Sequence, residues 1–296
     1  MSFAPIFQLL VVLAVIAAVV SIVSAIRYRT HLGQEPCVDA RRRIGSLYGF
    51  AALIGLMFAL VAVALFPTVY VNATAIPGMF AALAPSLAGI VFVVSAGFGE
   101  SFWPKPKGQR RDAFLTRRPA LANAAPLALW ACVTWALLLT VALVFCGIVA
   151  KRGGEDAGRA IMHPIWNPNV DGWNGPFPGF PYGIPMMIGV LALALATLAV
   201  LRIIARRPAI PGIQPDVDLQ LRQTSATNLV KGVQLSLAAS LSGVLLVAGI
   251  AASQGGSVEV DGYIAELAGH WWAYPAALLA FVVILIALIV TAWKQK

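Results

Sequence analysis

The sequence predicts an all-α polytopic membrane protein with seven transmembrane helices. Hydrophobic residues make up 60% of its 296 residues and charged residues 11%, whereas a soluble globular domain is about 45–50% apolar and about 25% charged. Seven apolar segments are each long enough to cross a bilayer, which takes about 20 residues. The Lys and Arg residues gather in alternate loops. These observations exclude an ordinary cytosolic enzyme, a disordered chain and a coiled coil.

The predicted spans form one transmembrane domain over residues 1–296, and none carries a charge in its central part. They cover residues 5–26, 45–66, 77–97, 126–150, 180–204, 229–252 and 270–293. The first is expected to be a retained helix rather than a signal peptide, because its positive cluster follows the apolar run. Pro85 is expected to kink the third span, since proline removes a backbone donor. Arg202 and Lys231 are expected to snorkel from the span ends to the interface.

The distribution of charge predicts the orientation. Alternate loops and the C-terminal tail hold 18 of the 21 Lys and Arg residues, which places the N-terminus outside and the C-terminus inside. The inner side then carries +12 and the outer side −3, which together give the net charge of +9. That charge therefore indicates topology and contact with anionic lipid rather than nucleic-acid binding. We expect a multi-pass protein of a bacterial plasma membrane.

Stripes of small residues predict close helix packing, because small side chains let helices approach in lipid. They comprise Ala14, Ala18, Ser21 and Ala25 in the first span, Gly78, Ala82, Ser86 and Gly89 in the third, and Gly232, Ser236, Ser240 and Gly243 in the sixth. We therefore expect these three helices to be well buried. Gln234, Ser236 and Ser240 are expected to form hydrogen bonds between helices, with a polar path through the bundle as the alternative.

Several chemistries lack the residues that they need. The three His residues lie in loops or at a helix end, which argues against a haem held inside the bundle. The last span has no Lys before Lys294 for a retinal Schiff base, and no span holds the buried acid or His typical of proton-coupled transport. Nucleophile-elbow and P-loop motifs are missing. We expect no enzymatic activity and no cofactor.

The predicted outer loop at 160–185 is rich in proline, glycine and aromatic residues, which indicates an ordered, non-helical segment. From it we select Trp166, Asp171 and Trp173 as candidate residues for binding a lipid or another amphiphile. The alternative is an aromatic belt at the level of the headgroups.

A second outer segment, residues 253–275, supplies acidic and aromatic residues. We predict a short interfacial helix at 261–269, with Asp261 as its cap. The two outer loops together offer His163, Glu259, Asp261 and His270 as candidate metal ligands. They lack a recognised ligand spacing such as HExxH, so we favour a solvated acidic rim and predict no metal site.

The inner stretch 98–118, FGESFWPKPKGQRRDAFLTRR, combines Trp103 with stiffening prolines and many basic residues. Glu100 is expected to pair with a nearby Arg. The stretch is either a docking loop for a cytosolic partner such as an ATPase or a basic loop that rests on anionic lipid. In the next inner loop, Asp216 or Asp218 is expected to cap a helix that leads into the sixth span.

A resemblance appears in GESFWPKPKGQRR, RDAFLTRR and DGWNGPFPGFPYGIP. With these stretches the chain resembles, over most of its length, multi-pass membrane proteins of high-GC Gram-positive bacteria. Such proteins are often encoded beside transcription regulators and ABC-type ATPases, so the resemblance implies a transport or envelope-stress setting. It carries over no site residues.

We therefore predict a non-enzymatic, permease-like or accessory subunit of an envelope or ABC-type transport system. Its expected partners are the lipid bilayer and a cytosolic ATPase or another membrane subunit. The alternative is a sensor or binding protein for an extracytoplasmic lipid or amphiphile. An envelope enzyme with a metal on its outer face is the third hypothesis.

Overall fold

A computed structural model of the chain describes residues 36–64, 76, 78–103, 124–154, 156–162, 173–208, 213–254, 256–260, 263–267 and 269–292, with the backbone alone for the two ranges 256–260 and 263–267. Within these ranges, six helices are long and apolar enough to cross a membrane, which supports a multi-pass membrane protein. The predicted span at 5–26 lies outside the described residues, so the count of seven and the orientation stay predictions.

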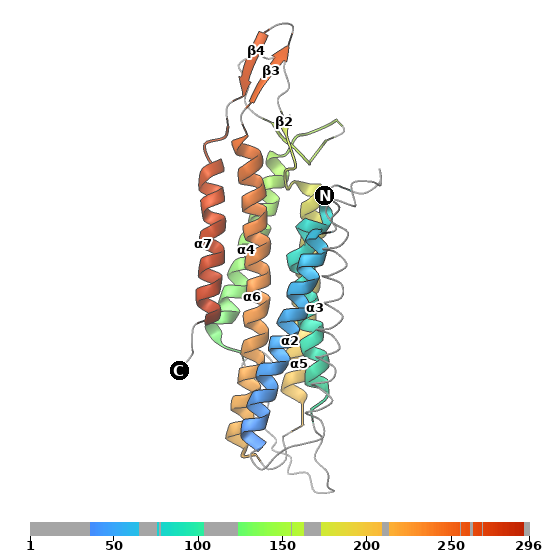
Figure 1. Cartoon of the computed structure of the whole chain (residues 1–296), viewed down its shortest axis with the longest axis vertical. Coiled ribbons are helices and arrows are strands. Elements are labelled where there is room, and N and C mark those ends of the chain that lie inside the picture. The colour runs from blue at the N-terminus through green and yellow to red at the C-terminus, as the bar shows by residue number, and fades with distance from the viewer. Residues whose placement is uncertain are drawn as a thin grey trace.

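The helices form one elongated bundle (Figure 1). In chain order they are α2 (Pro36–Ala64), α3 (Met79–Ser101), α4 (Pro126–Val149), α5 (Phe180–Arg206), α6 (Pro215–Ser253) and α7 (Ala273–Ala292). Two antiparallel pairs join β1 (Ile161–Met162) to β2 (Trp173–Asn174) and β3 (Gly256–Val260) to β4 (Tyr263–Leu267). We call the end where α3 and α5 begin and α6 ends the hairpin end, and the opposite end the arginine end.

Helix α6 forms the centre of the bundle and packs against α2, α3, α4, α5 and α7. Of the 18 residues in the most apolar stretch of α6, 56% are buried, whereas the corresponding share in α7 is 17%. The expected burial of the sixth span is therefore confirmed. Helix α3 is no more buried than α5, at 33% each, because its other face is turned away from α6.

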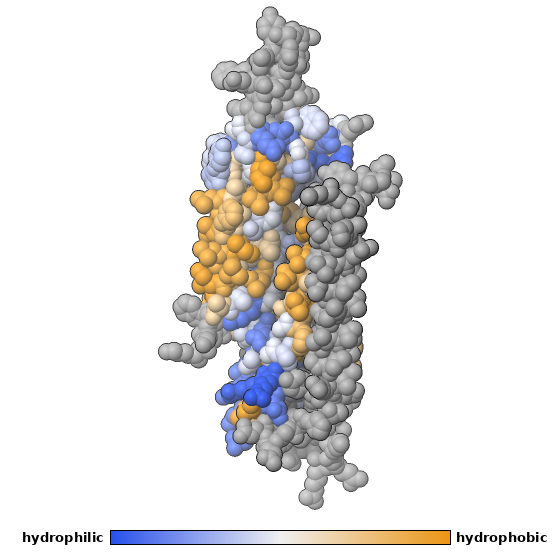
Figure 2. Space-filling view, viewed as in Figure 1, coloured by the Kyte–Doolittle hydropathy of each residue, from blue (hydrophilic) through white to orange (hydrophobic). Residues whose placement is uncertain are grey.

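Helix α6 also extends beyond the apolar layer. Its 39 residues span about 58 Å, whereas the hydrocarbon core is about 30 Å thick. Lys231 Nζ donates a hydrogen bond of 2.8 Å to the carbonyl of Thr291, near the end of α7. The turns of α6 before Lys231 therefore continue past α7 at the arginine end (Figure 1). Figure 2 shows the matching pattern, an orange belt between ends that carry more blue.

The small-residue stripes of α3 and α6 meet in the middle of the bundle, and the close helix packing predicted from them is found there. A Cβ on Gly89 would lie 2.8 Å from the Cβ of Ser236, so only glycine fits there. The Ser236 hydroxyl donates a hydrogen bond of 2.6 Å to the carbonyl of Pro85. On the other side of α3, the hydroxyl oxygen of Ser86 would lie 3.0 Å from a Cβ on Gly189 of α5. Close approach at these positions holds α3 between α5 and α6.

Two helices begin earlier than the predicted spans. Helix α2 starts at Pro36 rather than at residue 45, because Ala40 and Ile44 are buried and anchor its polar first turns. Helix α6 starts at Pro215, which confirms a helix leading into the sixth span. The predicted cap is wrong, since Gln214 holds that position and Asp218 pairs with Arg222 instead.

The predicted helix at 261–269 is wrong, because this region pairs as a β-hairpin whose strand β4 covers residues 263–267. The register places Val258, Val260 and Tyr263 on one face and Ser257, Glu259 and Glu266 on the other. Alternation with a period of two favours strands. Val260 pairs with Tyr263, and the sequence between them is Asp-Gly, a dipeptide strongly preferred in two-residue hairpin loops.

Candidate functional site

A cavity of about 220 Å³ lies at the hairpin end, between α3, α5, α6 and the segment that leads into α5. Its lining is almost entirely apolar. The lining residues are Gly78, Ala81, Ala82, Pro85, Pro176, Phe177, Pro178, Tyr182, Met186, Ser240, Gly243, Val244 and Val247. Concave, mostly apolar spaces with few polar groups are the usual binding sites for small molecules.

The cavity exists because the stripes of small residues continue beyond the point where α3 and α6 touch. Gly89 and Ser236 are in contact, but about two turns closer to the hairpin end the facing residues are Ala82 and Gly243. A Cβ added to Gly243 would meet nothing within 4 Å. Pro85 lies within α3 between these levels and removes the amide that would bond the carbonyl of Ala81. Small side chains on α3 and α6 at this level therefore leave space that they cannot fill.

The segment Pro176–Pro178 closes the cavity and is held from behind by the turn at 156–160. The amide of Phe177 donates a hydrogen bond of 2.8 Å to the carbonyl of Arg159, and the Phe177 side chain is fully buried. Gly158 has φ +74°, a left-handed conformation that favours glycine. A Cβ on Gly175 would lie 2.9 Å from the Arg159 carbonyl oxygen. The segment is therefore a fixed wall of the cavity, in agreement with the ordered loop that the sequence predicts.

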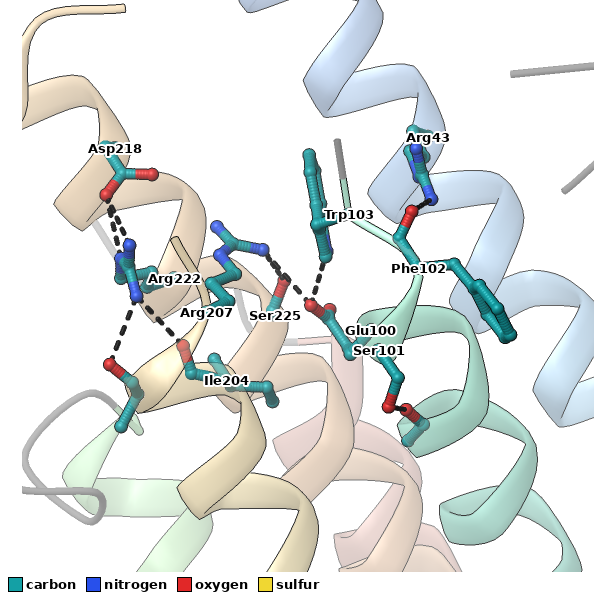
Figure 3. Close-up of polar contacts among 12 residues, drawn as sticks. Arg43, Glu100, Ser101, Phe102, Trp103, Ile204, Arg207, Asp218, Arg222 and Ser225 are labelled. Carbon is teal, nitrogen blue, oxygen red and sulfur yellow. Dashed lines mark hydrogen bonds and ion pairs between the residues drawn. The ribbon is translucent and has the colours of Figure 1, made fainter. Parts of the chain in front are cut away.

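The arginine end is built differently, from a buried charged cluster (Figure 3). Arg207 Nη1 lies 3.1 Å from Glu100 Oε2, and both side chains are at most 1% exposed. Trp103 Nε1 donates to the same carboxylate at 2.6 Å, and Tyr48 donates to its other oxygen at 3.2 Å. The expected pairing of Glu100 with an Arg is thus confirmed, although the partner comes from the end of α5.

The indole of Trp103 packs between two guanidinium groups. The Cζ atom of Arg43 lies 4.8 Å from the ring centroid and that of Arg207 lies 4.3 Å from it, both within the range of a cation–π contact. Arg43 also donates to the carbonyl of Phe102 at the end of α3, at 2.8 Å. The stack therefore joins α2, α3 and the end of α5.

A second buried pair joins α6 to the end of α5. Arg222 lies 2.8 Å from Asp218, and its Nη1 donates to the carbonyls of Ile204 and Ala205, each at 3.1 Å. A cation near the last carbonyls of a helix satisfies free acceptors and the helix dipole together. Charged side chains thus fill the arginine end, whereas the hairpin end retains a cavity.

In the middle of α6, Gln234 and Ser236 form hydrogen bonds between helices, as predicted, whereas the bond that Ser240 donates stays within α6. Gln234 is fully buried, accepts from Trp135 Nε1 at 2.9 Å and donates to the carbonyl of Ala287 at 2.8 Å. It also donates to the Thr291 hydroxyl. Ser240 donates to the carbonyl of Ser236 within α6. These bonds join α4, α6 and α7.

Of the predicted ligand-binding residues, Trp166 and Asp171 lie outside the described residues. Trp173 lies on β2, is 45% exposed, and faces Lys151, whose Nζ lies 4.9 Å from the ring centroid. Trp173 does not belong to the lining of the cavity. The cavity uses the same loop, but through Pro176, Phe177 and Pro178.

The candidate metal ligands are not brought together within the described residues. His163 and Asp261 lie outside them, and Glu259 is described by its backbone on β3. His270 Nε2 lies 3.0 Å from the carbonyl of Met162 and links the end of β1 to the start of α7. In the described part of the chain, no three His, Cys, Asp or Glu side chains are grouped so that they could hold a metal.

No family model, no curated protein and no solved structure matches the chain. The resemblance drawn from the loop sequences therefore stays a prediction.

Proposed function

We propose that this membrane protein binds, without catalysis, the alkyl chain of an amphiphile in the cavity at the hairpin end. The observation that carries the proposal is the cavity itself, a partly open apolar space of about 220 Å³ that is lined by three helices and a proline-rich wall. This function is the alternative predicted from the sequence. The proposed site is now the cavity lined by Phe177, in place of Trp166, Asp171 and Trp173.

The volume limits what enters. An apolar cavity of about 150 Å³ is enough to bind benzene, whereas sites for drug-sized ligands measure about 300–1,000 Å³. The cavity of this chain, at about 220 Å³, lies between these values. It therefore suits one end of an alkyl or isoprenoid chain, with the polar part of the ligand outside.

The source of the ligand follows from the hydrophobic effect. An alkyl chain that enters the cavity from water is stabilised by about 0.8 kcal/mol of transfer free energy for each buried methylene. A lipid tail that already lies in the bilayer gains little, because hydrocarbon is as apolar as the lining. The lining comes from the first turns of α3 and α5, close to the water boundary. The cavity therefore favours a single-chain amphiphile from the aqueous phase over bulk lipid.

Photolabelling of the full chain in nanodiscs tests the proposal. The probe is decanoate with a terminal diazirine, and the labelled peptides are mapped by mass spectrometry. We expect adducts near Met186 and Val247, which line the cavity. Gly243→Leu fills the free space beside Gly243. Displacement of even two methylenes costs about 1.6 kcal/mol, which is roughly a tenfold loss of labelling.

Gly49→Leu is the matched control. Gly49 is an exposed helical glycine of α2 whose added Cβ would also meet nothing within 4 Å, but it does not line the cavity. This variant should label like the wild type. Labels spread evenly over the lipid-facing helices, and unchanged by Gly243→Leu, would refute the proposal.

The first prediction from the sequence, an accessory subunit of a transport system, depends on the basic stretch at 98–118. The structure describes this stretch only as far as Trp103. The ATPase partner, the transport role and the plasma-membrane location therefore stay predictions. They are compatible with amphiphile binding, since a binding subunit can serve a transporter.

A further inference from the structure

Arg207 has hydrogen-bond donors that no described residue uses. A guanidinium carries five N–H groups. Nη1 of Arg207 bonds to Glu100 at 3.1 Å and contacts the Ser225 hydroxyl at 3.5 Å. Within the described part of the chain, Nε and Nη2 have no partner, although the side chain is only 1% exposed. More than nine in ten buried polar groups are satisfied in native proteins, so these donors require an explanation.

The free edge of Arg207 has the geometry of an oxyanion site. Nε–H and one Nη2–H point in parallel, and such a fork binds two oxygens of a phosphate or carboxylate at once. The opposite edge is fixed by Glu100, and the Trp103 ring covers one face of the guanidinium. The donors are therefore held in one orientation before any ligand binds.

The local charge also favours an anion. The buried charged residues in the described ranges are Arg43, Arg207 and Arg222 against Glu100 and Asp218, an excess of one positive charge. Arg43 and Arg222 bond to carbonyls at the ends of α3 and α5. Arg207 pairs with Glu100 and Arg222 pairs with Asp218, so the excess positive charge belongs to the cluster as a whole.

We propose that the Nε–Nη2 edge of Arg207 binds one phosphate group that also carries a hydroxyl donor. The hydroxyl is required because Asp218 Oδ1 is a second buried atom without a hydrogen-bond partner among the described residues. In Figure 3 this oxygen is turned from Arg222 toward the side of Arg207. A ligand with oxygen acceptors alone would place two negative groups near each other. Phosphatidylglycerol and inorganic phosphate both supply an acceptor and a donor.

The depth of the site matches a lipid headgroup. Lys231 bonds to Thr291 near the end of α7, which marks the edge of the apolar layer. Ser225, which contacts Arg207, lies six residues earlier on α6, or about 9 Å further out. Headgroups extend about 5–8 Å beyond the hydrocarbon on each side. The phosphate of a lipid beside the bundle would therefore lie at about the same depth as Arg207, and its binding requires the buried site to open.

Native mass spectrometry of the full chain tests the site. The protein is released from nanodiscs of phosphatidylcholine that contain a minor share of phosphatidylglycerol. We expect one phosphatidylglycerol molecule to stay bound. In Arg207→Lys the charge is kept but the fork is lost, so occupancy should fall at least about tenfold. Arg206→Lys, at the exposed neighbouring position, should bind like the wild type.

A second arm identifies the source of the phosphate. In pure phosphatidylcholine nanodiscs, added inorganic phosphate should raise the melting temperature of the wild type but not of Arg207→Lys if the natural ligand is a free phosphate. If only phosphatidylglycerol binds, the ligand is a lipid. A wild type that retains no phosphatidylglycerol and does not respond to phosphate overturns the proposal, and this readout does not depend on the folding of any variant.

Discussion

The two ends of the bundle are built from the same helices, but the space between these helices stays open at one end and is filled by side chains at the other. At the hairpin end, α3 and α6 face each other with Ala82 and Gly243, and the space between them stays open. At the arginine end, the side chains of Glu100, Trp103 and Arg207 fill the space and bind one another. Beyond the close contact of α3 and α6, small residues leave a cavity at the hairpin end, and large polar side chains fill the space at the arginine end.

The comparison also separates two kinds of stability. The apolar end gains little from water exclusion, because lipid and helix are equally apolar. The polar end depends on every member of its network, since a buried charge without its partner is costly. We therefore expect the arginine end to tolerate substitution poorly and the hairpin end to tolerate it well.

The largest effect is expected for Glu100→Gln. The substitution keeps the shape of the side chain but leaves Arg207 without its only carboxylate among the described residues, and Trp103 Nε1 with a weaker acceptor. Removal of one partner from a buried pair costs about 3–5 kcal/mol. The measurement is the free energy of unfolding in mixed micelles titrated with SDS.

Asp156→Asn is the control at the hairpin end. Asp156 pairs with Arg159 at 3.5 Å, and both side chains are about one third exposed. An exposed pair contributes about 0–1 kcal/mol, so little change is expected. If Glu100→Gln and Asp156→Asn lowered the free energy of unfolding equally, the two ends would not differ in their tolerance of substitution.

An intermediate effect is expected for Gly89→Ala at the crossing. The new Cβ would overlap Ser236 and lie 3.2 Å from Leu193, and overpacking of this kind typically costs about 1–3 kcal/mol. Gly243→Ala adds the same methyl group where nothing lies within 4 Å. Gly243→Ala should leave the free energy of unfolding unchanged or raise it by up to about 1 kcal/mol, because alanine has the higher helix propensity. Both are measured by the same SDS titration, and a destabilised Gly243→Ala would mean that the cavity is smaller than described.

The sequence predicts the spans well, because hydropathy reports contact with lipid directly. The stripes of small residues that contain Gly89 and Ser236 predict close packing, but the sequence does not say which helices meet there. The Asp218–Arg222 pair has the i,i+4 spacing that favours such contacts on a helix, so the sequence carries a signal for this pair.

The cavity could not be predicted in the same way, and for the main charged cluster the sequence predicts an Arg partner for Glu100 but not which Arg. The volume of the cavity depends on how far two helices diverge beyond their contact, and no local pattern encodes that distance. Glu100 and Arg207 lie 107 positions apart, and each stands at a span end where charge is already explained by topology. Their pairing follows from tertiary packing alone.

The smallest effect is expected for Trp173→Ala. Trp173 is half-exposed and contacts Lys151 through its ring, an interaction of about 0.5–1 kcal/mol at an exposed site. It does not line the cavity, so labelling by the diazirine probe should stay unchanged while the free energy of unfolding falls by no more than that amount. A loss of labelling as large as that of Gly243→Leu would mean that the ligand extends from the cavity onto the loop. In that case the residues selected from the sequence would form part of the same binding site.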